Sequence, residues 1–169
     1  MEKHYLYTLK IKRRKERIQG LVVDMGNEWI LFQDIPVDYV VDGFLLIRKI
    51  FLESFYRTKS EIFKEMVIKI NKKNHILYDL LPLDSVLDLF TTFMRNQSII
   101  QFDLHDDTVT YLGVVTTIFN KTFYIKPLLP SGCWGERESY FIDNIRTIRF
   151  NNDYINSLVN YNHYTETDI

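Results

Sequence analysis

The chain of 169 residues has a formal net charge of −1, and 46% of its residues are hydrophobic. This apolar content is enough for one sizeable core or two small ones, and it excludes a generally disordered chain. Alanine does not occur, whereas isoleucine, tyrosine and phenylalanine are abundant. Because alanine is the best helix former, and β-branched and aromatic residues favour strands, the composition predicts a mainly β protein.

Cys133 is the only cysteine, so an intramolecular disulfide and a cysteine-based metal site are both excluded. A single cysteine suits a reducing compartment. The N-terminal residues lack the uninterrupted apolar run of a signal peptide, and no run approaches the ~20 apolar residues of a membrane-spanning helix. We therefore expect a cytoplasmic protein without a membrane partner.

Alternating apolar residues and turn signals predict five strands in the first half of the chain. Gly26 and Asn27 separate the second strand from the third, and we expect them to adopt the left-handed conformations of a tight hairpin. The five strands span residues 5–11, 18–25, 29–32, 43–50 and 52–55.

Two helices are predicted in the middle of the chain. Ser60 is a candidate cap for the first helix, and the residues after it form one apolar face: Ile62, Phe63, Met66, Val67 and Ile70. A joint over residues 71–83 follows. Asp84 is the candidate cap of a second helix over residues 85–95, whose inward side chains are Val86, Leu89, Phe90 and Phe93.

The second half of the chain repeats the plan of the first. It contains five more predicted strands and a helical segment with Tyr154, Leu158 and Tyr161 on one side. Asn120 and Lys121 form a tight turn between two of these strands. The strands span residues 99–104, 109–118, 122–128, 139–142 and 145–150.

The two halves match at a fixed distance along the chain. An offset of 93 residues aligns Gly20 with Gly113 and Phe55 with Ile148. In the middle, a one-residue shift aligns Trp29 with Phe123 and Pro36 with Pro130. The pattern predicts one small β unit that is used twice.

Five short strands with tight turns favour a small barrel, because closure removes the exposed edges of a short sheet. We therefore predict a mainly β protein with a few helices (α+β), in which two tandem small SH3-like/Sm-like β-barrels are joined by a helical connector. The first barrel with its helix is expected over residues 1–75, the connector over residues 76–97, and the second barrel over residues 98–169.

The second half also carries a pattern that resembles an uncharacterised family of bacterial proteins with such barrels. The resemblance covers about residues 83–161 and is carried by Tyr111-Leu112-Gly113-Val114-Val115, by Gly132 and Trp134, and by the run from Ile142 to Phe150. The family has no assigned activity, so the resemblance implies no catalytic residue and no cofactor.

Charge is distributed unevenly between the halves. Residues 1–75 hold 15 Lys and Arg against 10 Asp and Glu, and residues 76–169 hold 6 against 12, so the halves carry +5 and −6. Opposed charges attract the halves to each other or lead them to different partners. The simpler interpretation is divergence between two copies of one unit.

The most concentrated charge is a basic run in the first predicted turn. Six cations at a hairpin tip are suited to gripping the phosphates of RNA or single-stranded DNA, and the simpler alternative is a solvated turn that protects a sheet edge. The run consists of Lys10, Lys12, Arg13, Arg14, Lys15 and Arg17.

Two other groups are weaker candidates. Cys133 and Trp134 lie in a loop flanked by glycines, but no histidine is spaced to activate the thiol, and the indole is expected to fold back over the barrel end. The run His105-Asp106-Asp107 follows Asp103 but lacks a third ligand for a metal on the same face. We expect no metal, no cofactor and no enzymatic activity.

The sequence predicts a non-enzymatic binding or scaffolding protein, with a protein or peptide as its first-choice partner. Binding of RNA or single-stranded nucleic acid through the basic run is the alternative. Self-assembly through sheet edges is a third hypothesis, and the oligomeric state stays open.

Overall fold

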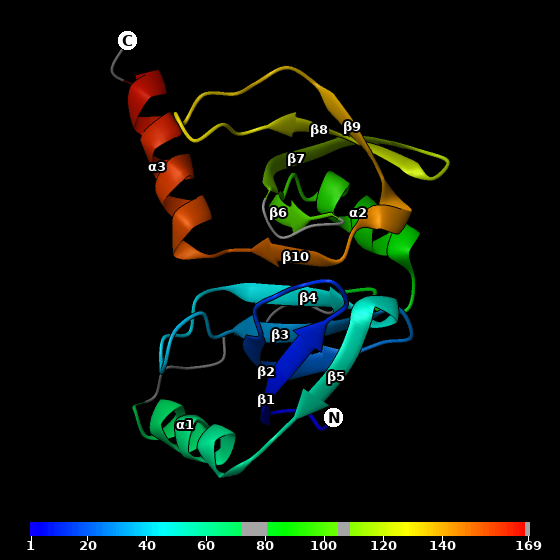
Figure 1. Ribbon diagram of the computed structural model, residues 1–169. Coiled ribbons are helices and arrows are strands. Elements are labelled where there is room, and N and C mark those ends of the chain that lie inside the picture. The colour runs from blue at the N-terminus through cyan, green and yellow to red at the C-terminus, as the bar shows by residue number, and fades with distance from the viewer. Residues whose placement is uncertain (72–80, 105–108, 168–169) are drawn as a thin grey trace.

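The computed structural model describes residues 1–71, 81–104 and 109–167. Its strands form one antiparallel sheet of ten, in the order β5-β1-β2-β3-β4-β10-β6-β7-β8-β9 (Figure 1). The strands are β1 (Leu6–Ile11), β2 (Ile18–Met25), β3 (Trp29–Asp34), β4 (Phe44–Arg48), β5 (Leu52–Tyr56), β6 (Ile99–Asp103), β7 (Thr110–Phe119), β8 (Thr122–Pro127), β9 (Glu138–Phe141) and β10 (Thr147–Phe150). The α-helices are α1 (Lys59–Ile70), α2 (Val86–Arg95) and α3 (Asp153–Thr167).

The mainly β composition with a few helices is confirmed, but the prediction of two closed barrels joined by a helical connector is wrong. Strand β4 pairs with β10, with Leu45 opposite Arg149 and Phe44 opposite Phe150, so the two halves merge into one open sheet. The physical reason is that backbone groups at an edge need partners. Here each half satisfies one edge by pairing with the other half, and not by closing on itself.

The predicted repeat appears in the strand order and in the register. Strands β1–β5 follow the order 5-1-2-3-4, and their counterparts repeat this order in the same direction along the sheet as β10-β6-β7-β8-β9. Gly20 lies opposite Asp34 in the first half, and Gly113 lies opposite Pro127, 93 residues later in both strands. Both β2 and β7 carry a register shift at equivalent positions, after Val22 and after Val115.

The predicted one-residue shift between the copies is wrong. Trp29 pairs with Arg48 in the first half, and Thr122, 93 residues after Trp29, pairs with Phe141. Phe123 is therefore the counterpart of Ile30 and not of Trp29. The shift was predicted because both residues are large and aromatic. The backbone pairing instead keeps the offset of 93 residues between equivalent positions.

The turn between β2 and β3 forms for a different reason from the one predicted. Neither Gly26 nor Asn27 has a positive φ. A Cβ atom at Gly26 would lie 2.4 Å from the backbone carbon of Leu83, and the Leu83 carbonyl accepts hydrogen bonds from the N–H groups of Glu28 and Trp29. Glycine is therefore needed here because another segment of backbone approaches closely.

One hydrophobic core extends across both halves of the sheet. Trp29 and Phe44 from the first half belong to the same buried cluster as Phe90, Phe102 and Phe123 from α2 and the second half. Helix α2 packs against β7 and buries Leu89, Phe90 and Phe93 in this cluster. The inward face predicted for this helix is confirmed at those three residues.

Helices α1 and α3 follow equivalent strands, β5 and β10, and lie at the same side of the molecule in Figure 1. The side-chain oxygen of Asn152 accepts the N–H of Ile155 and caps α3, which packs through Ile155 on Leu112 and Leu128. Within the described ranges, no helix is long and apolar enough to cross a membrane.

Some predictions fall outside the described residues. They are most of the joint over residues 71–83, the boundary between residues 75 and 76, and the run His105-Asp106-Asp107.

Candidate functional site

The basic run predicted as a phosphate grip lies in the turn between β1 and β2, where most of its cations contact the protein itself. The ammonium of Lys10 lies 3.7 Å from Glu53, and that of Lys12 donates to the carbonyl of Ile50. Arg14 donates to Asp103 at 2.8 Å, and Arg17 donates to the hydroxyl of Tyr56 at 2.8 Å, while Arg13 and Lys15 are exposed in the same turn. At least four of the six cations of the run therefore contact side chains or carbonyls of neighbouring segments.

The contact of Arg14 belongs to a charged cluster at the junction of the two halves. Asp103 on β6 accepts from Arg14 and, at 2.6 Å, from the hydroxyl of Thr147 on β10. Arg149 on β10 donates from Nε to Asp34 on β3 at 2.7 Å and lies 3.5 Å from Asp103. Arg149 thus contacts buried carboxylates from both halves, and Arg14 of the first half contacts Asp103 of the second.

Asp34 is the most constrained member of this cluster. Burial raises the pKa of Asp34 above its usual value, although the guanidinium of Arg149 acts in the opposite direction. One carboxylate oxygen, Oδ1, is buried and has no hydrogen-bond partner in the described part of the chain. The charge of Asp34 is therefore stabilised mainly by Arg149.

A polar cleft of about 610 Å³ lies beside the charged cluster. Its charged walls are largely paired with each other: Arg149 with Asp34, and Lys64 with the side-chain oxygen of Gln19 at 2.9 Å. It is lined by residues of the basic turn, of β3, of α1 and of β10, including Arg14, Arg17, Asp34, Lys64 and Arg149. The cleft therefore belongs mainly to the first half, and of the residues that the structure describes, Arg149 is the one from the second half that lines it.

The loop with Cys133 and Trp134 packs against α3. Cys133 is exposed as a free thiol. Trp134 packs against the cluster of Leu112, Leu128 and Ile155, and its indole N–H donates to the side chain of Asn162 at 3.3 Å. The indole does fold back onto the protein, but it covers the contact between α3 and the sheet. The loop therefore helps to hold α3 on the sheet.

Helix α1 is held to the sheet by two buried carboxylates. Glu65 accepts the backbone N–H of Leu6 at 3.0 Å, together with the side chains of Arg57 at 3.0 Å and Lys69 at 2.6 Å. Glu61 accepts the hydroxyl of Thr8 at 2.8 Å. Burial raises the pKa of Glu65, but the hydrogen bonds from its partners outweigh that effect and hold it below the usual value. These charged hydrogen bonds, together with the buried side chain of Ile68, fix which side of α1 faces the sheet.

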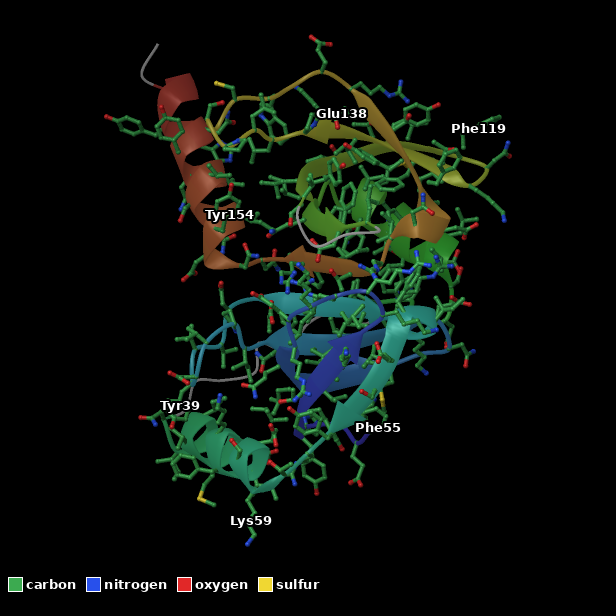
Figure 2. The ribbon with its side chains drawn as sticks, in the orientation of Figure 1. Tyr39, Phe55, Lys59, Phe119, Glu138 and Tyr154 are labelled. Carbon is green, nitrogen blue, oxygen red and sulfur yellow. The ribbon has the colours of Figure 1, made fainter. Side chains whose placement is uncertain are left out.

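The apolar face of α1 consequently points away from the sheet. Ile62, Phe63, Met66 and Ile70 are all exposed, with Phe63 at 56% and Ile70 at 72%, whereas Glu61 and Glu65 are buried. Tyr39, from the loop between β3 and β4, contacts Phe63 edge to face at 6.3 Å between ring centroids. Figure 2 shows α1 at one end of the molecule, with Tyr39 and Lys59 at its borders. We call Ile62, Phe63, Met66 and Ile70 the α1 face.

Sequence reasoning found the residues of the α1 face but not their exposure. An apolar stripe on a helix normally packs on the core, and the sequence contains no direct indication that this one does not. The available signal was the pair Glu61 and Glu65, four residues apart on the opposite side of the helix. Their partners Leu6 and Thr8 lie more than 50 residues away and become neighbours only in the fold.

Among the described residues, no group of three His, Cys, Asp or Glu side chains is placed to hold a metal ion. Comparison of the chain with protein families, curated proteins and solved structures found no match. The resemblance to a bacterial family therefore stays a prediction, and the function has to be proposed from the geometry of the chain.

Proposed function

We propose that this protein is a non-enzymatic binding or scaffolding module that docks a partner protein on the α1 face. One observation supports the proposal: α1 buries Glu61 and Glu65 and exposes Phe63, Met66 and Ile70. Soluble proteins seldom expose contiguous apolar side chains of this size without an interaction partner. The two carboxylates hold the helix in this orientation before any partner arrives, which lowers the entropic cost of binding.

The partner that fits the α1 face is an apolar or amphipathic segment of another protein. Helix faces of this kind pair with apolar side chains spaced three and four residues apart. A large aromatic residue in such a face commonly contributes much of the binding energy. Phe63 is the aromatic residue of the α1 face, and its ring contacts that of Tyr39. We place this function in the cytoplasm, which suits the single exposed thiol of Cys133.

The substitution Phe63→Glu tests the proposal. The full chain is used as bait in an extract of the source organism, the captured protein is identified and purified, and its affinity is measured by calorimetry. We expect Phe63→Glu to weaken binding by about tenfold or more, because it removes an aromatic contact and places a charge in an apolar interface.

The matched control is Phe119→Glu, since Phe119 is also an exposed phenylalanine but lies at the end of β7, in the other half of the sheet (Figure 2). This variant should bind like the unmodified chain. A purified partner that binds both variants with unchanged affinity would show that the α1 face is not the docking surface.

A further inference from the structure

The two edge strands of the sheet, β5 and β9, are the counterparts of the two strands that pair at its centre, β10 and β4. In the described part of the chain, β5 and β9 each have a neighbouring strand on one side only. Strand β9 lies 93 residues after β4, and β5 lies about 93 residues before β10. Inside the chain β4 and β10 pair with each other. The molecule therefore displays at its ends the two kinds of edge that it joins in its middle.

We propose that a second copy of this chain pairs its β5 with β9 of the first copy and continues the sheet head to tail. The internal junction gives the register of this contact. Leu46 lies opposite Ile148 in the chain, and the offset of 93 residues converts this pair to Ser139 of one copy opposite Phe55 of the next. The same conversion places Tyr140 opposite Ser54.

The exposed side chains at both ends support this pairing. Phe55 on β5 is 46% exposed and Phe141 on β9 is 63% exposed. Ile148, the counterpart of Phe55, is fully buried within the β4–β10 junction. A large apolar side chain at an open edge leaves that edge prone to pairing, and the proposed contact would cover Phe55 as the internal junction covers Ile148.

The uneven charge of the chain favours the same arrangement. The half that carries β5 has a net charge of +5 over residues 1–75, and the half that carries β9 has −6 over residues 76–169. Head-to-tail contact brings the acidic half of one copy against the basic half of the next, which favours association and its polarity. Two copies joined through identical edges would instead bring like charges together.

A head-to-tail contact leaves one free β5 and one free β9 after every addition. Such contacts continue until the assembly closes into a ring, or they extend into a filament when the rotation does not close. In both cases the assembly contains more than one chain. The contact is separate from the α1 face, so Phe63→Glu is expected to leave self-association unchanged.

The mass of the full chain in solution tests the proposal. Sedimentation velocity over a wide range of concentrations should show assemblies of two or more chains. Phe55→Lys should shift the chain toward the monomer, because it places a charge at the edge. The control is Leu87→Lys, a change at an exposed apolar residue of α2, which should leave the mass unchanged. A chain that stays monomeric at every concentration, or an assembly that Phe55→Lys leaves intact, overturns the proposal.

Disulfide trapping tests the register. In a Cys133→Ser background, a Ser139→Cys preparation is mixed with a Phe55→Cys preparation under mild oxidation. We expect a crosslinked pair to form several times faster than in the control mixture of Ser139→Cys with Glu53→Cys, which places the second thiol two residues along β5. Equal rates in the two mixtures would contradict the β9–β5 pairing.

Discussion

Replacing Arg149 with methionine is expected to lower the free energy of unfolding by about 3–5 kcal/mol, the usual cost of breaking a buried ion pair from one side. Arg149 donates to Asp34 at 2.7 Å and lies 3.5 Å from Asp103. Both carboxylates are buried, so the change leaves two largely desolvated charges without this cation. Chemical denaturation followed by circular dichroism measures the loss.

Two further variants identify the cause of that loss. Arg137→Met removes an arginine that is exposed and contacts the ring of Tyr124, and it should change the stability by less than about 0.5 kcal/mol. Adding Asp34→Asn to Arg149→Met should recover part of the stability, because it removes the carboxylate that loses its only cation among the described residues, whereas Asp103 keeps Arg14. A loss below about 1 kcal/mol for Arg149→Met, with no recovery in the double variant, would mean that this cluster does not hold the halves together.

Replacing Phe123 with alanine is expected to cost about 3–5 kcal/mol and to lower the unfolding midpoint by roughly 10 °C. Phe123 is fully buried and its ring lies within 6 Å of three other rings, those of Phe90, Phe102 and Tyr140. The cavity left by the ring lies in the core that both halves share. The first half should therefore lose stability together with the second.

The fluorescence of Trp29 reports on the first half in a Trp134→Phe background, since the chain has two tryptophans. Trp29 is buried on β3. In Phe123→Ala, the unfolding midpoint measured by its fluorescence should fall by the same amount as the midpoint measured for the whole chain. Phe119→Ala, at an exposed phenylalanine, should shift neither midpoint. An unchanged Trp29 midpoint in Phe123→Ala would show that the halves unfold independently.

The strands and helices were predictable because their signals are local. Alternation over a few residues marks a strand, and the ten strands and three helices lie close to the predicted ranges, for example β2 over Ile18–Met25. Asn120, with a φ of 54°, has the left-handed conformation that its place in a tight turn predicts. The offset of 93 residues was also visible, since equivalent strands must bury equivalent faces.

The joining of the halves was not predicted, because which edges meet depends on contacts between distant residues. A usable signal was present in β4, where Phe44-Leu45-Leu46-Ile47 is apolar at every position. Such a run indicates a strand covered on both faces, and all four residues are buried. An edge strand of a separate small barrel does not need apolar side chains on both faces.

The charged residues were the least predictable. Arg14 stood out as part of a basic run, yet its partner Asp103 lies 89 residues away. Glu61 and Glu65 are typical acidic residues for the first turns of a helix. They are buried because α1 packs beside β1, and this placement depends on the path of β5. Local sequence patterns therefore identified the ionisable groups but not their partners.

The measurement that tests the central claim most directly is nuclear magnetic resonance of the β4–β10 junction in the full chain. Antiparallel pairing brings the Hα atoms of alternate opposed residues close together. We predict cross-strand Hα contacts at alternate pairs of the set from Thr147 opposite Ile47 to Phe150 opposite Phe44, with slow amide exchange along both strands. Fast exchange along β4 and no contact between β4 and β10 would contradict a single sheet built from two equivalent halves.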